Sequence, residues 1–516
     1  MNGAESLLRS LLANGVDVCF ANPGTSEMHF VAALDDVPGM RPMLVLQENV
    51  ATGAADGYGR MAGGPACTLL HLGPGLANGL ANLHNARRAA SPIVNIVGDH
   101  AASHLQYDAP LTSDIKGFAQ PVSDWVHSSS SARDVGAAAA MAVKVALEYP
   151  GRIATLILPA DTAWNEAEGV AGRVTRPAAT RVSADTVDRI ATLIEESSKT
   201  TIIIRGEALQ ERGLKAAGKI AAHTGARLMC DTFTPRLQRG AGCVPVERLP
   251  YFSEQVVEFL AGTELIVLVG TKPPVSFFGY PDKASWLTPQ GCRLAVLAQP
   301  QEDGVGAIEA LGEACGAANA RPVVAERETR NYAMTGPLSA EFIMGVVANH
   351  LPENAIVADE SASSGFPYYA LTGTAAPHDY LNLTGGSVGS MMAVSIGASV
   401  ACPDRKVVTL QGDGNGMYSV QALWTQARES LDIVTVIYAN RAYKILNNEL
   451  KRVGAANHGR NAASLMSLEN PSIGWVQLAG GLGVNAVRVE TRADFENAFS
   501  QAMREKGPPR LIEAVI

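Results

Sequence analysis

Residues 407–448 read VVTLQGDGNGMYSVQALWTQARESLDIVTVIYANRAYKILNN, and this stretch decides the fold that we expect for the chain. An apolar run typical of a β-strand, Val407–Leu410, leads into Gly412-Asp413-Gly414. An amphipathic helical pattern follows, and a second apolar run, Ile433–Tyr438, ends just before Asn440. A strand–loop–helix–strand unit of this kind places both loops at the carboxyl ends of parallel strands, where open α/β sheets bind ligands.

The residue types in these two loops suit a magnesium-bound diphosphate. Asp413 supplies a carboxylate and Asn440 an amide oxygen, the hard ligands that Mg²⁺ takes beside substrate phosphates. Gly412 and Gly414 let the backbone approach an anion closely, and the helix that follows offers free N–H groups. Taken alone, Gly-Asp-Gly is more often an ordinary turn, so the interpretation depends on the spacing to Asn440.

That spacing resembles the cofactor signature of thiamine-diphosphate (ThDP) enzymes. Asn440 follows Asp413 by 27 positions and closes the second strand. The family signature ends in Asn-Asn, whereas this chain has Ala439-Asn440, so the first Asn is missing and the ligand Asn is kept. The resemblance is greatest to the benzoylformate decarboxylase and acetolactate-synthase-like branch, and it extends over nearly the whole chain. It implies ThDP as cofactor and Mg²⁺ held by Asp413, Asn440 and the backbone carbonyl of Ala442.

Length and composition fit a large α/β enzyme. The 516 residues suggest about three domains. Hydrophobic residues make up 47% and charged residues 18% of the chain, which fits a compact globular protein. The net charge of -9 argues against a nucleic-acid or membrane partner. The seven cysteines form no CxxC pair, and we find no signal-peptide pattern and no long apolar span, so we expect a cytoplasmic protein with reduced thiols.

Helical patterns alternate with short apolar runs, which predicts parallel sheets covered by helices. Residues 166–183 and 317–340 lack strong periodicity and are interpreted as connectors. By the family resemblance, the fold class is α/β with three doubly wound parallel-sheet domains. These are a pyrimidine-binding domain over 1–165, a middle domain over 184–316 and a diphosphate-binding domain over 340–516.

The strands expected from the apolar runs are spread over all three units. They are Val16–Ala21, Met43–Leu46, Cys67–Leu72, Ile93–Val97, Ala154–Leu158, Thr201–Ile204, Arg227–Cys230, Leu265–Val269, Arg293–Leu297, Ala355–Ala358, Val407–Leu410, Ile433–Tyr438 and Leu511–Ile516.

Three residues of the first unit resemble catalytic positions of the family. Glu48 lies in Leu-Gln-Glu-Asn-Val-Ala, which resembles the activating-glutamate segment, where a carboxyl group hydrogen-bonded to the aminopyrimidine ring helps to remove the thiazolium C2 proton. Read alone, Glu48 is also an acidic residue favoured in a first helical turn. His71, in His-Leu-Gly-Pro-Gly, matches a histidine that faces the substrate. Thr25, in Asn-Pro-Gly-Thr, falls at a substrate-facing hydroxyl; a structural histidine and a simple turn are the alternatives.

Further residues are expected to contact the cofactor. Val388, in a Gly-rich segment, resembles the apolar residue that bends the cofactor, although family members use the larger Leu, Met or Ile. Ser363 and Ser364 fall where family hydroxyls meet the diphosphate, and they could equally be helix N-caps. The expected cofactor-binding set is Ser363, Ser364, Gly386, Val388, Gly412, Asp413, Gly414, Asn415, Asn440, Ala442 and Tyr443.

The middle unit bears on the substrate. Benzoylformate-type decarboxylases place a second histidine in a segment that resembles residues 274–280 here. This chain has no histidine in residues 224–349, and Phe277, Phe278 and Tyr280 offer an apolar wall instead. Three aromatic residues in a loop pack against the rest of the protein as often as they line a substrate pocket. Without that proton donor, we expect weak benzoylformate decarboxylation and more carboligation from small 2-oxo acids such as pyruvate.

The function expected from the resemblance is that of a ThDP/Mg²⁺-dependent, acetolactate synthase-like enzyme. It would decarboxylate a 2-oxo acid and either transfer the acyl-carbanion equivalent to a second carbonyl or protonate it. A benzoylformate-type decarboxylase, a lyase of 2-hydroxyacyl thioesters and a non-catalytic ThDP-binding subunit are the alternatives. A NAD-dependent dehydrogenase is disfavoured because no Gly-x-Gly-x-x-Gly loop follows a strand.

The resemblance also bears on assembly and on flavin. Glu48 would come from the neighbouring subunit, so we expect a homodimer at minimum and a homotetramer as the full assembly. True acetolactate synthases hold FAD in the middle unit. Here Ile204-Arg205-Gly206-Glu207 and Gly270-Thr271-Lys272 are weak nucleotide signals, so FAD is not expected.

Overall fold

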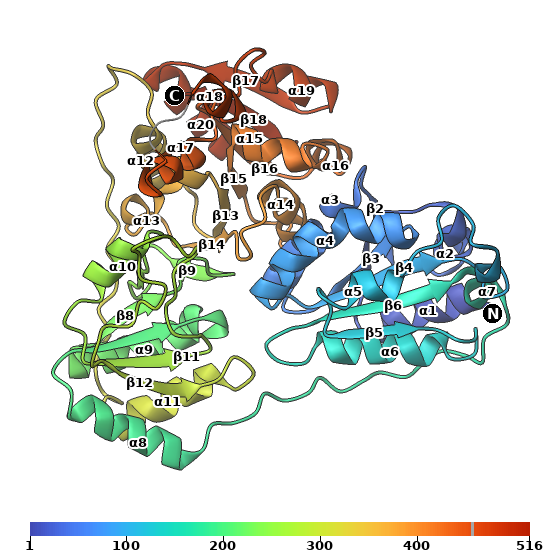
Figure 1. Ribbon diagram of the computed structural model, residues 1–516, viewed down its shortest axis with the longest axis horizontal. Coiled ribbons are helices and arrows are strands. Elements are labelled where there is room, and N and C mark those ends of the chain that lie inside the picture. The colour runs from blue at the N-terminus through green and yellow to red at the C-terminus, as the bar shows by residue number, and fades with distance from the viewer. Residues whose placement is uncertain (456–458) are drawn as a thin grey trace.

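The computed structural model describes residues 1–455 and 459–516. It contains three sheets of six, five and seven strands, each flanked by helices (Figure 1). The N-terminal sheet lies in the blue to cyan part of the ribbon and the middle sheet in the green to yellow part, while the C-terminal sheet lies in the orange to red part except for its green edge strand. The predicted fold class, three parallel-dominated α/β units, is therefore confirmed.

The N-terminal sheet is wholly parallel, in the order β2-β1-β3-β4-β6-β5. Its strands are β1 (Val18–Asn22), β2 (Arg41–Leu44), β3 (Ala66–Leu70), β4 (Ile93–Asp99), β5 (Trp125–Ser128) and β6 (Ile153–Pro159). Its helices are α1 (Gly3–Ala13), η1 (Thr25–Glu27), α2 (Met28–Asp36), α3 (Glu48–Ala62), α4 (Leu72–Ala89), η2 (Leu105–Tyr107), α5 (Ile115–Ala119), α6 (Val135–Ala146) and α7 (Ala160–Trp164).

The middle sheet is also parallel, in the order β10-β8-β7-β11-β12. Its strands are β7 (Thr200–Ile204), β8 (Arg227–Cys230), β10 (Glu247–Arg248), β11 (Leu265–Val269) and β12 (Arg293–Ala298). Its helices are α8 (Ala184–Glu195), η3 (Gly206–Leu209), α9 (Glu211–Thr224), α10 (Ser253–Phe259) and α11 (Gly304–Ala314).

The C-terminal sheet has the order β17-β18-β16-β15-β13-β14-β9. Its strands are β9 (Leu237–Arg239), β13 (Ala355–Glu360), β14 (His378–Asn382), β15 (Val407–Gly412), β16 (Ile433–Ala439), β17 (Asn485–Val489) and β18 (Arg510–Val515). The edge strand β9 comes from the middle part of the chain and is antiparallel to β14. The helices of the C-terminal unit are α12 (Ala340–His350), η4 (Ala362–Gly365), α13 (Tyr368–Leu371), α14 (Met391–Ala401), α15 (Asp413–Gly416), η5 (Met417–Ser419), α16 (Ala422–Arg428), α17 (Lys444–Arg452), α18 (Arg460–Leu465), α19 (Trp475–Gly481) and α20 (Arg492–Arg504).

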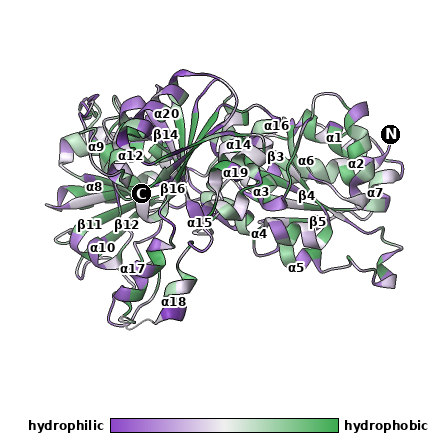
Figure 2. Ribbon diagram, turned by 90° about the horizontal axis from the view of Figure 1, so that it is seen from above, coloured by the Kyte–Doolittle hydropathy of each residue, from purple (hydrophilic) through white to green (hydrophobic). Residues whose placement is uncertain are grey.

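The strands of the sheets are apolar because both faces are covered. Every residue of β3, β11 and β16 is buried, and the strands are largely green in the hydropathy colouring of Figure 2. Continuous Val, Ile and Leu runs are typical of parallel strands buried on both faces. In residues 1–455 and 459–516, no helix has the length and apolar character needed to cross a membrane.

The N- and C-terminal units pack directly on each other through α3 and α14. A Cβ on Gly57 would lie 2.0 Å from the carbonyl oxygen of Val394, and one on Gly397 would lie 1.8 Å from the carbonyl oxygen of Ala54. The two helix backbones therefore touch where neither can carry a side chain. Residues of both helices belong to one buried apolar cluster. This contact fixes the N-terminal unit against α14 of the C-terminal unit.

Some strands and boundaries differ from the sequence prediction. Strands β5, β9, β10, β14 and β17 were not predicted, because they are short, polar or mostly exposed; β14, for example, reads His-Asp-Tyr-Leu-Asn. The predicted strand Cys67–Leu72 is too long, because the chain turns at His71 and Leu72 begins α4. The helix predicted after the Gly-Asp-Gly loop is present as α16, but α15 and η5 precede it, so the stretch is not one continuous helix.

Candidate active site

The Gly412-Asp413-Gly414 loop and Asn440 lie side by side at one sheet edge. Strands β15 and β16 are parallel neighbours, so both loops leave the sheet at the same side. Oδ2 of Asp413 accepts the backbone N–H of Arg441 at 2.7 Å, and Oδ1 of Asn440 accepts the N–H of Ala442 at 3.1 Å. The side chains predicted as metal ligands therefore belong to one hydrogen-bonded cluster.

These loops offer the donors and the close backbone packing that a magnesium diphosphate needs. Asp413 is 5% exposed, and burial raises the pKa of its carboxyl group, so a nearby cation would favour its ionised form. A Cβ on Gly414 would lie 2.6 Å from the Tyr443 ring, so the loop passes too close for a side chain. The described residues hold no group of three or more His, Cys, Asp or Glu arranged for a metal. A magnesium here would use amide and carbonyl oxygens and the diphosphate beside one carboxylate, which is its usual ligand set.

Backbone strain marks several loops that follow strands. Arg441, Ala362 and Leu72 have φ values of 55°, 50° and 50°. Each lies two residues beyond the end of a strand, namely β16, β13 and β3. Non-glycine residues in this region cost free energy and concentrate at functional sites. Sequence patterns give no sign of this strain.

A buried carboxylate that the sequence did not reveal holds the loop of Val388. We call this segment, residues 384–391, the 384–391 loop. Glu360, at the end of β13, is 3% exposed and accepts the consecutive backbone N–H groups of residues 389–391, at 2.8 and 2.9 Å for the last two. It therefore caps the start of α14. Burial raises the pKa of Glu360 to about 7, although the N–H donors oppose the shift.

Two of the predicted diphosphate contacts follow Glu360 closely along the chain. Ser363 and Ser364 are part of η4, and among the described residues neither hydroxyl makes a hydrogen bond. They are therefore not the helix N-caps that the sequence left open. Nδ2 of Asn415 reaches the carbonyl oxygen of Glu360 at 3.4 Å, and the N–H of Tyr443 donates to the carbonyl oxygen of Met466 at 2.9 Å.

Glu48 is a buried residue that begins α3. Its Oε2 accepts a hydrogen bond from Nδ2 of Asn78 in α4 at 3.0 Å. In the part of the chain that the structure describes, no hydrogen bond joins its carboxylate to the C-terminal unit. Within one chain, Glu48 thus belongs with α4 and not with the Asp413 loop.

His71 forms a second polar cluster at the start of α4. Its Nδ1 lies 2.8 Å from Oε2 of Glu27, a carboxylate that is 1% exposed. Glu27 also accepts the N–H of Gly24 at 2.7 Å and the hydroxyl of Ser26 at 2.5 Å. Ser26 Oγ lies 3.3 Å from Nδ1 of His71, whereas Thr25 is exposed beside it. Glu27 was not among the predicted site residues, although it stands with Thr25 in Asn-Pro-Gly-Thr-Ser-Glu.

The aromatic segment of the middle unit reaches the 384–391 loop. A Cβ on Gly386 would lie 2.9 Å from the ring of Phe277, which is 46% exposed. The rings of Phe277 and Phe278 are 4.9 Å apart, and those of Phe278 and Tyr280 are 6.1 Å apart. These three aromatic residues therefore extend from the 384–391 loop as a continuous apolar surface.

The segments considered as nucleotide signals line a cavity that reaches Thr384, at the start of the 384–391 loop. Residues 205–207 and 270–272 follow β7 and β11, and they face a cavity of about 910 Å³. Arg87 and Arg88, at the end of α4, line its other side. The cavity is not lined by the Gly412-Asp413-Gly414 loop.

Comparisons with known proteins agree with this arrangement. The family described as thiamine pyrophosphate enzyme matches through its N-terminal TPP binding domain over residues 1–127 and its C-terminal TPP binding domain over residues 366–514. A Mycobacterium tuberculosis protein, named as a candidate acetolactate synthase large subunit IlvX, is 48% identical over 100% of this chain and 99% of its own length.

Two further relatives carry decarboxylase names. Benzoylformate decarboxylase of Pseudomonas aeruginosa is 28% identical over 96% of each chain. The structure of the thiamine diphosphate-dependent 4-hydroxybenzoylformate decarboxylase of Rhodococcus jostii RHA1 has a TM-score of 0.87 at 23% identity, and the match covers 99% of this chain and 98% of that chain. At 23% identity, the similarity to this structure is evidence for the fold alone.

Proposed function

Because this chain belongs to the thiamine pyrophosphate enzyme family, we propose that it is an acetolactate synthase-like enzyme that decarboxylates a 2-oxo acid and joins the acyl unit to a second carbonyl. The observation that carries the proposal is the Asp413–Asn440 cluster at the end of β15 and β16, beside the loop capped by Glu360. When bound, ThDP supplies the carbon nucleophile and the electron sink for the decarboxylation. The protein must then bind the cofactor and the 2-oxo acid, orient them toward each other and control the transfer of protons.

The diphosphate end is assigned to the C-terminal unit. Asp413, Asn440 and the carbonyl oxygen of Ala442 would hold Mg²⁺, because they provide oxygen ligands from one sheet edge. The N–H groups after Gly412 and the hydroxyls of Ser363 and Ser364 would face the diphosphate oxygens. Val388, which is half-buried, would support the cofactor from the 384–391 loop.

The proton chemistry is assigned to the N-terminal unit. Glu48 would hydrogen-bond the pyrimidine ring, and Asn78 holds its carboxylate in place. Glu48 makes its hydrogen bond within the N-terminal unit of its own chain, which supports a site completed by a second subunit. The functional unit in this proposal is a homodimer, with a homotetramer as the full assembly. The seven unpaired cysteines support a reducing, cytoplasmic setting.

His71 would handle protons at the substrate. Its Nδ1 faces Glu27, so its Nε2 is the atom left to give or take a proton. Thr25, exposed on the same loop, would meet the substrate carboxylate. A loop hydroxyl and an imidazole with a buried carboxylate behind it can together orient and protonate a small acid.

Carboligation is favoured over simple protonation by the aromatic segment. Phe277, Phe278 and Tyr280 supply no histidine, and their rings present a mostly apolar surface beside the 384–391 loop. Slow protonation would leave time for a second carbonyl to react. Candidate acetolactate synthase is also the name of the 48% identical relative.

The test is to incubate purified protein with ThDP, Mg²⁺ and a panel of 2-oxo acids, including pyruvate and benzoylformate. Carbon dioxide, aldehyde and ligation product are measured separately, with Asp413→Ala as the inactive control. We expect carbon dioxide and a ligation product from pyruvate, and slow turnover of benzoylformate. Fast release of aldehyde alone from benzoylformate, with no ligation at high acceptor concentration, would favour a benzoylformate-type decarboxylase. No turnover of any acid, despite ThDP binding, would favour a non-catalytic subunit.

A further inference from the structure

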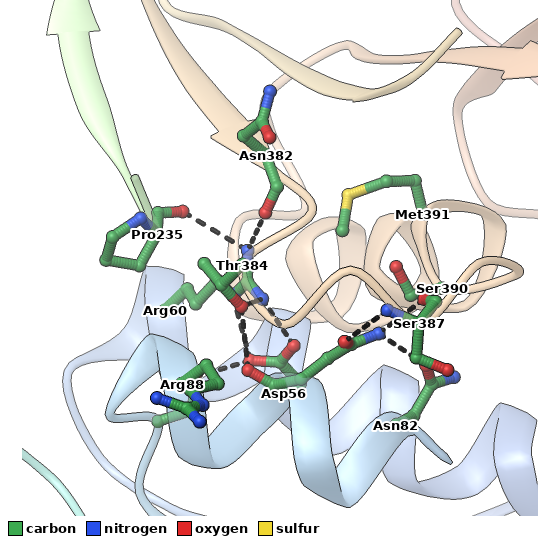
Figure 3. Close-up of polar contacts among 12 residues, drawn as sticks. Asp56, Arg60, Asn82, Arg88, Pro235, Asn382, Thr384, Ser387, Ser390 and Met391 are labelled. Carbon is green, nitrogen blue, oxygen red and sulfur yellow. Dashed lines mark hydrogen bonds and ion pairs between the residues drawn. The ribbon is translucent and has the colours of Figure 1, made fainter. Parts of the chain in front are cut away.

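The 384–391 loop is held from outside its own unit by the end of helix α4. Nδ2 of Asn85 donates to the carbonyl oxygen of Ser387 at 2.8 Å, and Oδ1 of Asn85 accepts the N–H of Ser387 at 3.2 Å. The side-chain amide thus pairs with both backbone groups of one loop residue, as a neighbouring strand would. Figure 3 shows Ser387 in this network above the helices of the N-terminal unit.

Two further contacts join the same helix turn to the loop. The hydroxyl of Thr384 donates to the backbone carbonyl oxygen of Asn85 at 2.7 Å. Nε2 of His84 lies 3.0 Å from the carbonyl oxygen of Gly385. Two successive loop residues, Thr384 and Gly385, and also Ser387 are therefore tied to α4, and all of these contacts span about 300 positions of sequence.

A buried ion pair supports this side of the loop. Nη2 of Arg60 lies 2.6 Å from Oδ2 of Asp56, and both side chains are almost fully buried. Nη1 of Arg60 donates to the carbonyl oxygen of Asn382 at 2.8 Å, and Nη2 reaches the hydroxyl of Thr384 at 3.3 Å. The strand end before the loop is thus fixed to α3, as Figure 3 shows.

The far end of the loop is fixed by its own unit. Glu360 accepts the N–H groups of residues 389–391. Val388 lies between this cap and the Ser387 backbone held by Asn85. Of the anchors, the Asn85 amide is the one bonded to the residue directly before Val388, and Asn85 is fully buried.

Helix α4 also carries groups assigned to proton chemistry. His71 precedes its first residue, and Asn78, in its second turn, holds Glu48. At about 1.5 Å of rise per residue, Asn85 lies roughly 20 Å along the helix from His71. One rigid helix therefore connects the His71 and Glu48 groups at one end with the 384–391 loop at the other.

From this geometry we infer that Asn85 is a positioning residue for cofactor binding. It fixes the Ser387 backbone, and with it Val388, at a set place relative to α4. The inference rests on the proposed function for the identity of the cofactor, but the anchoring itself does not need the cofactor. Loss of the amide frees the loop and weakens ThDP binding without removing any group that touches the metal.

The experiment compares Asn85→Ala with Asn95→Ala as a matched control. Asn95 is fully buried, as Asn85 is, and its side chain makes two hydrogen bonds, with Thr68 at 2.6 Å and with Thr155 at 3.0 Å, but these stay within the N-terminal sheet. Both changes should lower the melting temperature. Hydrogen–deuterium exchange of peptides spanning 384–391 is measured in cofactor-free protein, and the ThDP dissociation constant is measured by calorimetry with Mg²⁺ well below the melting temperature.

We expect Asn85→Ala to speed exchange in the 384–391 peptide and to raise the ThDP dissociation constant by about tenfold or more, because a lost hydrogen bond to an ordered group is worth a factor of this order. Asn95→Ala should leave the exchange rate and the dissociation constant within about twofold of the wild type, because the hydrogen bonds that it removes do not reach the loop. Unchanged exchange in Asn85→Ala overturns the anchoring. Faster exchange with unchanged ThDP affinity overturns the positioning role. Equal weakening by Asn95→Ala assigns the effect to general loss of stability and also overturns it. A wild-type protein that does not bind ThDP refutes the proposed function instead, and the exchange data still report on the anchoring.

Discussion

Nδ1 of His71 lies 2.8 Å from Oε2 of Glu27, and this carboxylate is buried beneath the loop that carries Thr25. A carboxylate accepts the Nδ1–H of imidazole and so leaves Nε2 free for proton transfer. A glutamine at this place could instead donate its amide N–H to Nδ1 and favour the other tautomer. The pair therefore makes Glu27 a positioning residue for His71.

Glu27→Gln should lower kcat by about 10²-fold, which is the usual scale for losing a positioned acid–base group. ThDP affinity should not change, because neither side chain is among the groups assigned to the cofactor or its metal. Steady-state kinetics and calorimetry on the same preparation check both statements. A variant with wild-type kcat would show that the contact is only structural.

Asp413→Ala should abolish Mg²⁺-dependent retention of ThDP. The carboxylate is the only charged ligand among the three assigned to the metal, and it also orders the Asn440 loop through the N–H of Arg441. Calorimetry with and without Mg²⁺ measures the effect. If the variant binds ThDP as the wild type does, the metal assignment is wrong.

Glu360 predicts a dependence of stability on pH. Its pKa is raised to about 7 from an ordinary value of 4.5, so the folded state holds this proton more tightly than the unfolded state does. The resulting stabilisation is fully present below about pH 4.5 and is lost as the pH rises through about 7, with a total on the order of 3 kcal/mol.

Glu360→Gln lacks this titration. The difference in free energy of unfolding between wild type and variant, measured in urea from pH 5 to pH 8, should therefore shift against the wild type as the pH rises. A difference that is constant over this range would mean that Glu360 is ionised throughout and that the three N–H donors outweigh burial.

The purified protein should be colourless. The segments 205–207 and 270–272 line a cavity of about 910 Å³ that has room for a large ligand. They nevertheless lack a glycine-rich nucleotide loop, so we predict no bound flavin. An absorbance band near 450 nm (roughly where oxidised flavins absorb, since the cofactor itself supplies that chemistry), at one equivalent per chain, would refute the prediction.

The parts of the site that were predictable from the sequence are those whose position follows from patterns in the neighbouring residues. The Gly-Asp-Gly loop and Asn440 lie on two successive apolar strands, so hydrophobic patterning placed them together. Glu27, Glu360 and Asn85 were missed because their roles depend on partners 44, about 30 and 302 positions away. Strands such as β14 were missed because polar residues that are buried by tertiary contacts carry no alternating pattern.

Exchange of the thiazolium C2 proton reports directly on whether this protein activates ThDP. Wild-type protein with ThDP and Mg²⁺ is mixed with deuterium oxide, quenched in acid and analysed by proton NMR, beside Glu48→Gln. Only a hydrogen-bonding group is changed in the variant, so fold and most ThDP affinity should persist. We predict exchange in the wild type that is faster than in free ThDP, and slowing by about two or more orders of magnitude in Glu48→Gln. Equal exchange rates in wild type, variant and free ThDP would contradict the account.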